Sequence, residues 1–149
     1  MPVFAGFDHV DCRVRSLAAV ESFYDALMPE VGLPRKRFSY VDDAGEWHDA
    51  SADHHYNTVE FFEEAQPDRA TFFMGLIERP DHVPGATRIA FRIEHARLFE
   101  MEAFLREIGA HNVERSEDFE TYPAIFFEDP AGTKLELVAR AVRTLELAV

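Results

Sequence analysis

The stretch FDHVDCRVRSLAAVESFYDAL at residues 7–27 predicts a strand that leads directly into a helix. Its first part alternates apolar and polar side chains, as a strand with one buried face does. The apolar positions are Val10, Cys12 and Val14. Apolar residues then recur at helical spacing after Ser16, a residue type that caps helix N-termini well, and Pro29 and Gly32 are expected to end the helix.

The same order of patterns occurs a second time. Residues 88–93, Arg-Ile-Ala-Phe-Arg-Ile, alternate apolar and polar side chains again, and a second helical pattern follows before Gly109. Five apolar helix positions match between the copies at a constant offset of 81 residues: Leu17, Val20, Phe23, Tyr24 and Leu27 with Leu98, Met101, Phe104, Leu105 and Ile108. A strand and a helix repeated in the same order indicate a duplicated unit.

Further strand-like runs follow each predicted helix. They cover residues 36–41, 57–62 and 71–77 in the first copy, and 112–115, 122–128 and 134–140 in the second. Asp129-Pro130-Ala131-Gly132 is a strong hairpin signal, and Gln66-Pro67-Asp68 is its weaker counterpart. Each copy therefore has the predicted order β-α-β-β-β.

The predicted fold class is α+β, with two tandem βαβββ units whose curved mixed sheets enclose a pocket. The units cover about residues 5–78 and 86–140, and a proline- and glycine-containing linker covers 79–85. A length of 149 residues suits one domain over 1–149. Residues 42–56 have no periodicity and are predicted to form a long loop near the pocket mouth.

Composition and charge exclude several functions. The formal net charge of −13 and the pI near 4.8 argue against nucleic acid and anionic lipid as partners, because phosphate-binding surfaces need clustered Lys and Arg. No apolar run approaches the roughly 20 residues that span a bilayer. Cys12 is the only cysteine, and the first residues lack a signal-peptide pattern, so a cytoplasmic location is expected.

Strand alternation groups several polar residues. It places His9 on the strand face away from the first predicted helix, and it places Arg88 and Glu136 on the corresponding face of the second copy. Alignment of the two hairpin turns sets Phe73 at the position of Glu136. We expect these four residues to share one concave face if the two units pair as pseudo-twofold halves.

Three stretches resemble the vicinal oxygen chelate superfamily, which includes glyoxalases, bleomycin-resistance proteins and extradiol dioxygenases. They are Phe7-Asp8-His9-Val10 with the Ser22-Phe23-Tyr24 helix, Arg88-Ile89-Ala90-Phe91-Arg92, and FEDPAGTKLELV at 127–138. The resemblance covers residues 5–140 and is most specific in the last stretch. It implies a small organic ligand and a homodimer, in which the apolar tail 141–149 is expected to pack on the partner subunit.

For metal-dependent members, the resemblance implies a divalent ion such as Zn, Ni, Fe or Mn, held by two His and one Glu. The three positions hold His9, Arg88 and Glu136 here. Arginine has no lone pair to donate, so only His9 and Glu136 remain as metal ligands. Phe73, at a fourth ligand position of some lyases, cannot coordinate either. Loop histidines are replacement candidates, although such residues are more often simply solvated: His48, His54 and His55.

A metal-free site is the alternative. Arg88 beside Glu136 favours an ion pair, to which His9 is able to hydrogen-bond. His9 also titrates near neutral pH and is a candidate for proton transfer. Tyr122 offers one hydroxyl and, with Phe119 and Phe126, an aromatic wall for a flat ligand, although most aromatics in such strands belong to the core. Trp47 and Tyr56 bracket the long loop as a potential lid, with ordinary anchoring favoured.

Two functions follow from these residues, with His9, Arg88, Glu136 and Tyr122 as the candidate catalytic residues. The first is a divalent-metal-dependent lyase, isomerase or dioxygenase with a degenerate metal site, in which the ion polarises paired oxygens of the substrate. The second is a metal-free ligand-binding or drug-sequestering protein, whose acidic aromatic groove holds a cationic or planar compound. Arg88 and Phe73 favour the second function, whereas His9 and Glu136 favour the first.

Overall fold

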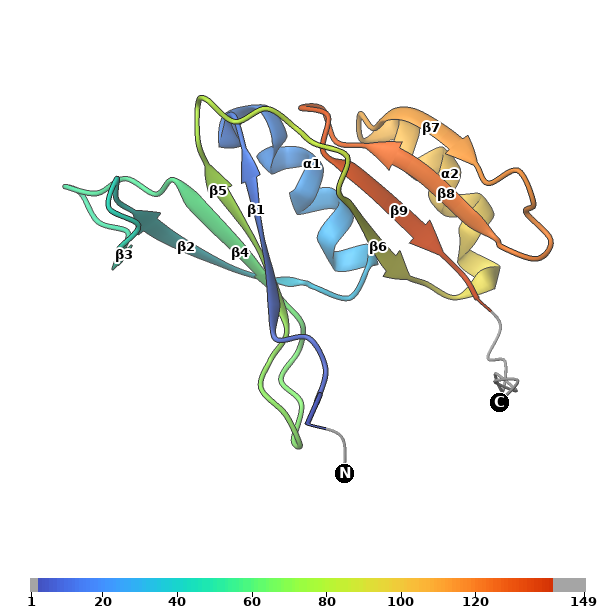
Figure 1. The fold of residues 1–149 in the computed structure, drawn as a ribbon, viewed down its shortest axis with the longest axis horizontal. Coiled ribbons are helices and arrows are strands. Elements are labelled where there is room, and N and C mark those ends of the chain that lie inside the picture. The colour runs from blue at the N-terminus through green and yellow to red at the C-terminus, as the bar shows by residue number, and fades with distance from the viewer. Residues whose placement is uncertain (1–2, 141–149) are drawn as a thin grey trace. The chain divides into compact units, whose positions relative to one another are not determined.

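The chain forms two compact units, Met1–Pro84 (unit 1) and Gly85–Val149 (unit 2). A computed structural model describes residues 3–140, so the proposed packing of the tail on a partner subunit lies outside the described residues. The units are shown in Figure 1 and are described here one at a time.

Unit 1 consists of one helix and a five-stranded sheet. Its elements are β1 (His9–Val14), α1 (Leu17–Glu30), β2 (Arg35–Val41), β3 (Trp47–Asp49), β4 (Thr58–Phe62) and β5 (Phe73–Glu78). The strand order is β1-β5-β4-β2-β3, with β1 parallel to β5 and every other pair antiparallel.

Unit 2 repeats this plan with four strands. Its elements are β6 (Arg88–Arg92), the short 3-10 helix η1 (His95–Arg97), α2 (Leu98–Glu107), β7 (His111–Arg115), β8 (Ala124–Glu128) and β9 (Lys134–Val138). The strand order is β6-β9-β8-β7, with β6 parallel to β9. In both units the first strand pairs with the last one, so the predicted tandem βαβββ fold is confirmed.

The helices begin and pack largely as the sequence predicts. Ser16 caps α1, because its hydroxyl oxygen accepts a hydrogen bond from the Ala19 amide at 3.3 Å. The helix continues one residue past Pro29 and ends before Gly32, whose φ of +93° suits glycine. All five predicted core positions of α1 are buried, whereas in α2 only three are fully buried: Leu98, Met101 and Leu105.

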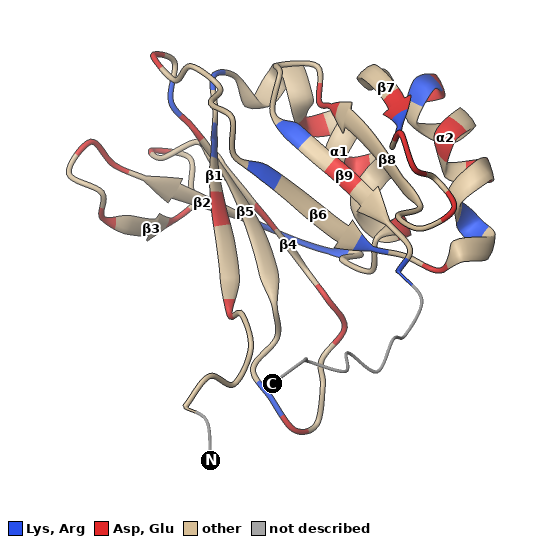
Figure 2. Ribbon diagram, turned by 45° about the vertical axis from the view of Figure 1, so that its right-hand side comes forward, with Lys and Arg blue, Asp and Glu red and all other residues tan. Residues whose placement is uncertain are grey.

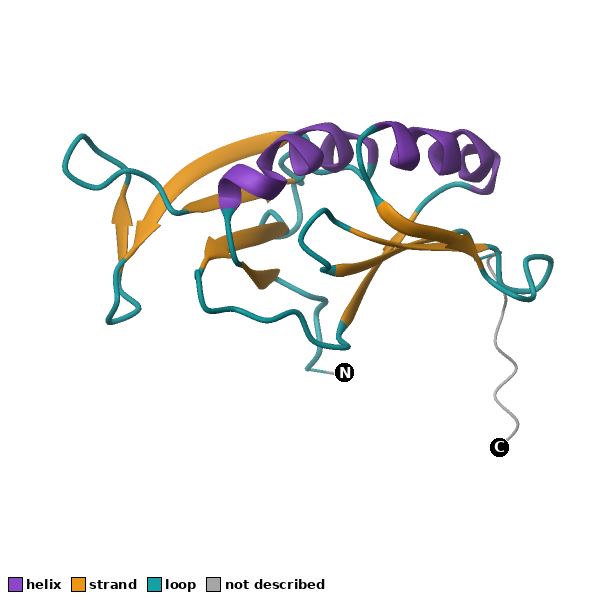
Figure 3. Cartoon of the chain, turned by 90° about the horizontal axis from the view of Figure 1, so that it is seen from above, coloured by secondary structure: helices purple, strands orange, loops and turns teal. Residues whose placement is uncertain are grey.

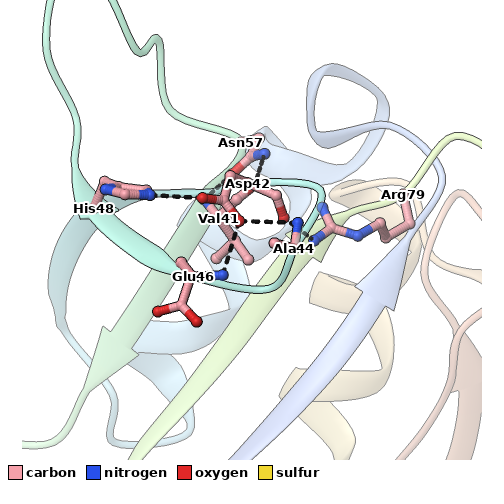
Figure 4. A network of polar contacts seen from close by, with 7 residues as sticks. All are labelled: Val41, Asp42, Ala44, Glu46, His48, Asn57 and Arg79. Carbon is pink, nitrogen blue, oxygen red and sulfur yellow. Dashed lines mark hydrogen bonds and ion pairs between the residues drawn. The ribbon is translucent and has the colours of Figure 1, made fainter.

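The predicted loop 42–56 contains a strand that sequence reasoning missed. Residues Trp47–Asp49 form β3, which pairs antiparallel with the end of β2. The Asp42 carboxylate shapes the connecting turn, since it accepts hydrogen bonds from the Ala44 and Glu46 amides at 3.0 and 2.8 Å (Figure 4). The predicted loop therefore contains a hairpin whose turn is held by side-chain hydrogen bonds.

In each unit, the helix covers one face of its own sheet and leaves the other face without a helix (Figure 3). In unit 1 the helix-covered face includes Lys36 of β2, whose ammonium contacts Glu21 and Asp25 of α1 at 2.6 and 2.8 Å. We call the other face of each sheet its open face. Figure 2 shows that charged residues occur within the strands β1, β6 and β9 themselves and not only in loops. Among residues 3–140, no helix is long and apolar enough to cross a membrane.

Candidate functional site

His9 lies on the open face of unit 1, at the end of an aromatic row. Its ring stacks on Phe73 of the neighbouring strand, with centroids 4.5 Å apart and planes within 3°. Phe73 in turn stacks on Phe62 at 4.7 Å. This stacking on one side of the ring favours one orientation of the imidazole plane.

Acidic neighbours surround the His9 ring. Its Nδ1 atom lies 2.6 Å from Asp8 Oδ2, and its Nε2 atom lies 3.6 Å from Asp11 Oδ2. The hydrogen bond with Asp8 raises the pKa of His9 above its ordinary value; desolvation opposes this, and the charges of Asp11 and Glu60 add to the rise. The environment of His9 thus favours the imidazolium form.

Glu136 lies on the open face of unit 2 and is only 5% exposed. Its Oε1 atom accepts a hydrogen bond of 2.6 Å from the Tyr122 hydroxyl. This hydrogen bond, together with partial burial, raises the pKa of the Tyr122 hydroxyl, although Arg140 nearby opposes the change. Tyr122 and Glu136, both predicted site residues, are therefore direct partners.

The expected ion pair between Arg88 and Glu136 is wrong. The ion pairs formed by the described residues do not include one between these two side chains; instead, the Arg88 guanidinium lies 4.4 Å from the ring centroid of Phe126. The reason is register, because Glu136 pairs with Ala90 and Phe126, while Arg88 pairs with Lys134. The guanidinium therefore engages the aromatic ring, and the carboxylate engages the tyrosine.

Ladder register also corrects the predicted equivalence of Phe73 and Glu136. His9 pairs with Phe73 in unit 1, as Arg88 pairs with Lys134 in unit 2. Glu136 lies two residues beyond Lys134, and the residue two positions beyond Phe73 is Gly75. With His9 equivalent to Arg88, the unit 1 counterpart of Glu136 is therefore Gly75, which has no side chain to coordinate anything.

Other predicted site residues lie elsewhere. The ring of Phe119 packs on Phe99 of α2, with the ring centroids 5.7 Å apart, and not with Tyr122 and Phe126. The Tyr56 hydroxyl donates to Glu21 of α1 at 3.0 Å, which confirms the anchoring role over the lid. The loop histidines have local partners, since His48 contacts Asp42, His54 contacts Tyr40 and His55 contacts Tyr56.

The recruitment of His48 or His54 toward His9 is not supported. His48 pairs with Tyr40 across the β2–β3 ladder, and His54 packs edge-on against Tyr40 at 4.6 Å. Tyr40 alternates with Lys36 on the helix-covered face, whereas His9 lies on the open face. These histidines therefore lie on the opposite side of the same sheet from His9.

The donor atoms at these positions do not fit the divalent ion that the resemblance implies. Only His9 and Glu136 have suitable atoms at the relevant positions, and Arg88 and Gly75 have none. Within residues 3–140, no group of three His, Cys, Asp or Glu side chains is arranged to hold a metal ion. Two donors from separate units do not fit the three-ligand pattern of catalytic sites. The convergence of His9 with Arg88 and Glu136 stays a prediction.

The structure adds a pocket that the sequence did not reveal. It has a volume of about 360 Å³, lies wholly within unit 1, and is lined by Arg37, Ser39, Trp47, His48, Asp49 and Glu60. Glu60, in the middle of β4, is only 6% exposed. The one sequence signal for it was a charged residue inside the apolar run Thr-Val-Glu-Phe-Phe.

The element order and strand pairing of the two units can be compared with known folds. No protein-family model and no curated protein sequence matches the chain. Solved structures do match it, and they show that the chain has the vicinal oxygen chelate, or glyoxalase-like, fold.

Three of these structures illustrate the match. The fosfomycin resistance protein FosX from Listeria monocytogenes, in complex with Mn(II) and sulfate, superposes with a TM-score of 0.62 at 14% identity and 94% coverage of both chains. FosX from Mesorhizobium loti gives a TM-score of 0.54 at 16% identity, covering 94% of this chain and 95% of its own. An integron cassette protein from the Halifax Harbour sewage outfall gives 0.53 at 19% identity, covering 91% and 99%.

Proposed function

We propose that this protein binds a small organic molecule without depending on a tightly bound divalent ion. The proposal rests on the partners that Arg88 and Glu136 have on the open face of unit 2. Where a metal-dependent relative would supply a second histidine, Arg88 lies over Phe126, and the neighbouring Glu136 carboxylate already has the Tyr122 hydroxyl at 2.6 Å.

The matched structures support a small-molecule ligand. A mutant of FosX from Listeria monocytogenes was crystallised with Mn(II) and 1S,2S-dihydroxypropylphosphonic acid, a compact organic compound. The open faces of this chain carry groups that are able to recognise such a compound: an arginine, a tyrosine hydroxyl and stacked aromatic rings. A homodimer and a cytoplasmic location accompany the proposal as expectations.

A metal-dependent lyase, isomerase or dioxygenase is the second candidate. It is favoured by the retained His9 and Glu136 and by the Mn(II) found in the FosX complexes. The two candidates differ in one measurable property, which is the divalent metal content of the purified chain.

The deciding experiment measures metal per chain by mass spectrometry after purification without chelators. We expect less than stoichiometric metal in the wild type and uptake of added Mn²⁺ or Zn²⁺ only in the Arg88→His variant, which restores a third donor. Arg69→His, the same substitution in an exposed loop of unit 1, is the matched control and should take up none. One tightly held ion per wild-type chain would overturn the proposal and establish the metal-dependent candidate.

A further inference from the structure

The pocket of unit 1 is built around one buried carboxylate. Glu60 Oε1 accepts a hydrogen bond of 2.8 Å from the Ser39 hydroxyl, and no hydrogen bond of the described residues engages Oε2. Glu60 also takes part in none of the ion pairs formed by residues 3–140. Arg37, its partner across the ladder, instead approaches Asp49 at 3.6 Å. The Glu60 carboxylate on the pocket floor thus forms no ion pair with the described residues, because the guanidinium of Arg37, its cross-strand neighbour, approaches Asp49 instead.

A second carboxylate strengthens this negative charge. Asp11, Gly75 and Glu60 occupy one row across the three strands β1, β5 and β4. Because Gly75 has no side chain, nothing separates the two acids: a Cβ atom there would lie 2.6 Å from Asp11 Oδ1 and 3.9 Å from Glu60 Cγ. Asp11 Oδ1 is itself buried without a hydrogen-bond partner. The other oxygen, Oδ2, lies 3.6 Å from His9 Nε2. A buried carboxylate oxygen without a partner is costly, so Asp11 Oδ1 and the unpaired charge of Glu60 favour a further donor or cation at this row.

Trp47 supplies an aromatic surface at the same pocket. It lies on β3, pairs with Val41 and is 47% exposed. The hairpin that carries it is held by the Asp42 turn, by the contact of His48 with Asp42 at 2.8 Å and by two 2.8 Å hydrogen bonds between Asn57 and the Val41 backbone (Figure 4). Trp47 is therefore presented on a fixed element, and tryptophan is the best aromatic partner for a cation.

We propose that this pocket binds a small organic cation, with a protonated amine at Glu60 and a flat body against Trp47. A volume of about 360 Å³ suits a ligand of this kind. The lining residues carry one positive and two negative formal charges, and since Arg37 approaches Asp49, the charge of Glu60 is left for a ligand. Asp11 lies beyond Gly75 from Glu60 and has His9 as its own neighbour. The inference rests on the proposed binding function and names its ligand class.

The test uses the only tryptophan of the chain as its reporter, because Trp47 itself lines the pocket. Wild-type protein is titrated with benzylamine, benzyl alcohol and benzoate, which share one flat ring but differ in charge. We expect saturable quenching by benzylamine with a Kd at least about tenfold below that of benzyl alcohol, and no saturation with benzoate. Equal affinities for benzylamine and benzyl alcohol would overturn the proposal, whatever the variants do.

Glu60→Gln removes the charge while its side-chain carbonyl still accepts the Ser39 hydroxyl, so the fold should survive. This variant should bind benzylamine no better than benzyl alcohol. The matched control is Glu64→Gln, which removes the same charge from an exposed position of unit 1 and should keep the wild-type preference. If Glu60→Gln keeps the preference as well, Glu60 is not the recognition group and the assignment is wrong. None of these readouts depends on metal content, so this inference and the proposed function are able to fail separately.

Discussion

The contact between Tyr122 and Glu136 allows a quantitative prediction. Replacement of Tyr122 by phenylalanine removes the donor that lies 2.6 Å from Glu136 Oε1, and Glu136 is only 5% exposed, so water does not readily replace this donor. Hydrogen bonds to charged groups contribute roughly 1.5–3 kcal/mol. Because Tyr122 itself is half-buried, we expect the variant to lose about 2 kcal/mol of unfolding free energy. For a chain of this size, that corresponds to a fall in Tm of about 4–8 °C.

A double-mutant cycle measures the interaction directly. Thermal and urea unfolding are followed by circular dichroism for the wild type, Tyr122→Phe, Glu136→Gln and the double variant. We expect a coupling energy of about 1–2 kcal/mol. Tyr40→Phe is the control, since the Tyr40 hydroxyl makes no hydrogen bond among the described residues, and it should change stability by less than about 0.5 kcal/mol. A Tyr122→Phe variant as stable as this control would refute the view that Glu136 is held by Tyr122.

Two further predictions concern the other predicted positions. Asp8→Asn should lower the pKa of His9 in an NMR titration, because the Asp8 hydrogen bond is the main cause of its rise. Since the pKa of His9 is higher in the folded than in the unfolded chain, protonated His9 stabilises the fold below about pH 6.5. This contribution disappears as the pH rises through the raised pKa. Asp129→Ala should lower the free energy of unfolding by at least about 2 kcal/mol in urea unfolding. The reason is that the buried Asp129 carboxylate accepts hydrogen bonds from the Ala131 and Thr133 amides at 2.8 and 2.9 Å. A loss under about 0.5 kcal/mol would contradict this prediction.

The fold could be predicted because its signals are local and occur twice. The alternation in β1 and β6, the cap at Ser16 and the turn before β9 all lie within short stretches of sequence. Strand β3 could not be predicted in this way. It has only three residues, all exposed, and it exists because the Asp42 turn folds it back onto β2. A strand that depends on its partner leaves no periodic pattern.

The candidate site could be predicted only as far as the face of each strand. Alternation correctly placed His9 on the open face of unit 1 and Glu136 on that of unit 2, but it does not give the register between strands. The predicted ion pair of Arg88 with Glu136 was wrong for that reason, because Arg88 lies opposite Lys134, two residues before Glu136 on β9. Glu60 was missed because its burial depends on Ser39 and Gly75, which lie on two other strands.

The two copies of the βαβββ unit have the same parallel pairing of their first and last strands but carry different charges on their open faces. At equivalent positions, unit 2 has Glu136, already bonded to Tyr122, and unit 1 has Gly75 between two carboxylates. Among the described residues, Arg88 forms no ion pair and its guanidinium lies over the Phe126 ring, so unit 2 retains a cation that is available to an anionic group. Because Glu60 gives unit 1 the opposite preference, the charge of a ligand that binds tells which unit recognises it. Saturable binding of benzoate that depends on Arg88, without any for benzylamine, would assign recognition to unit 2 and not to the Glu60 pocket.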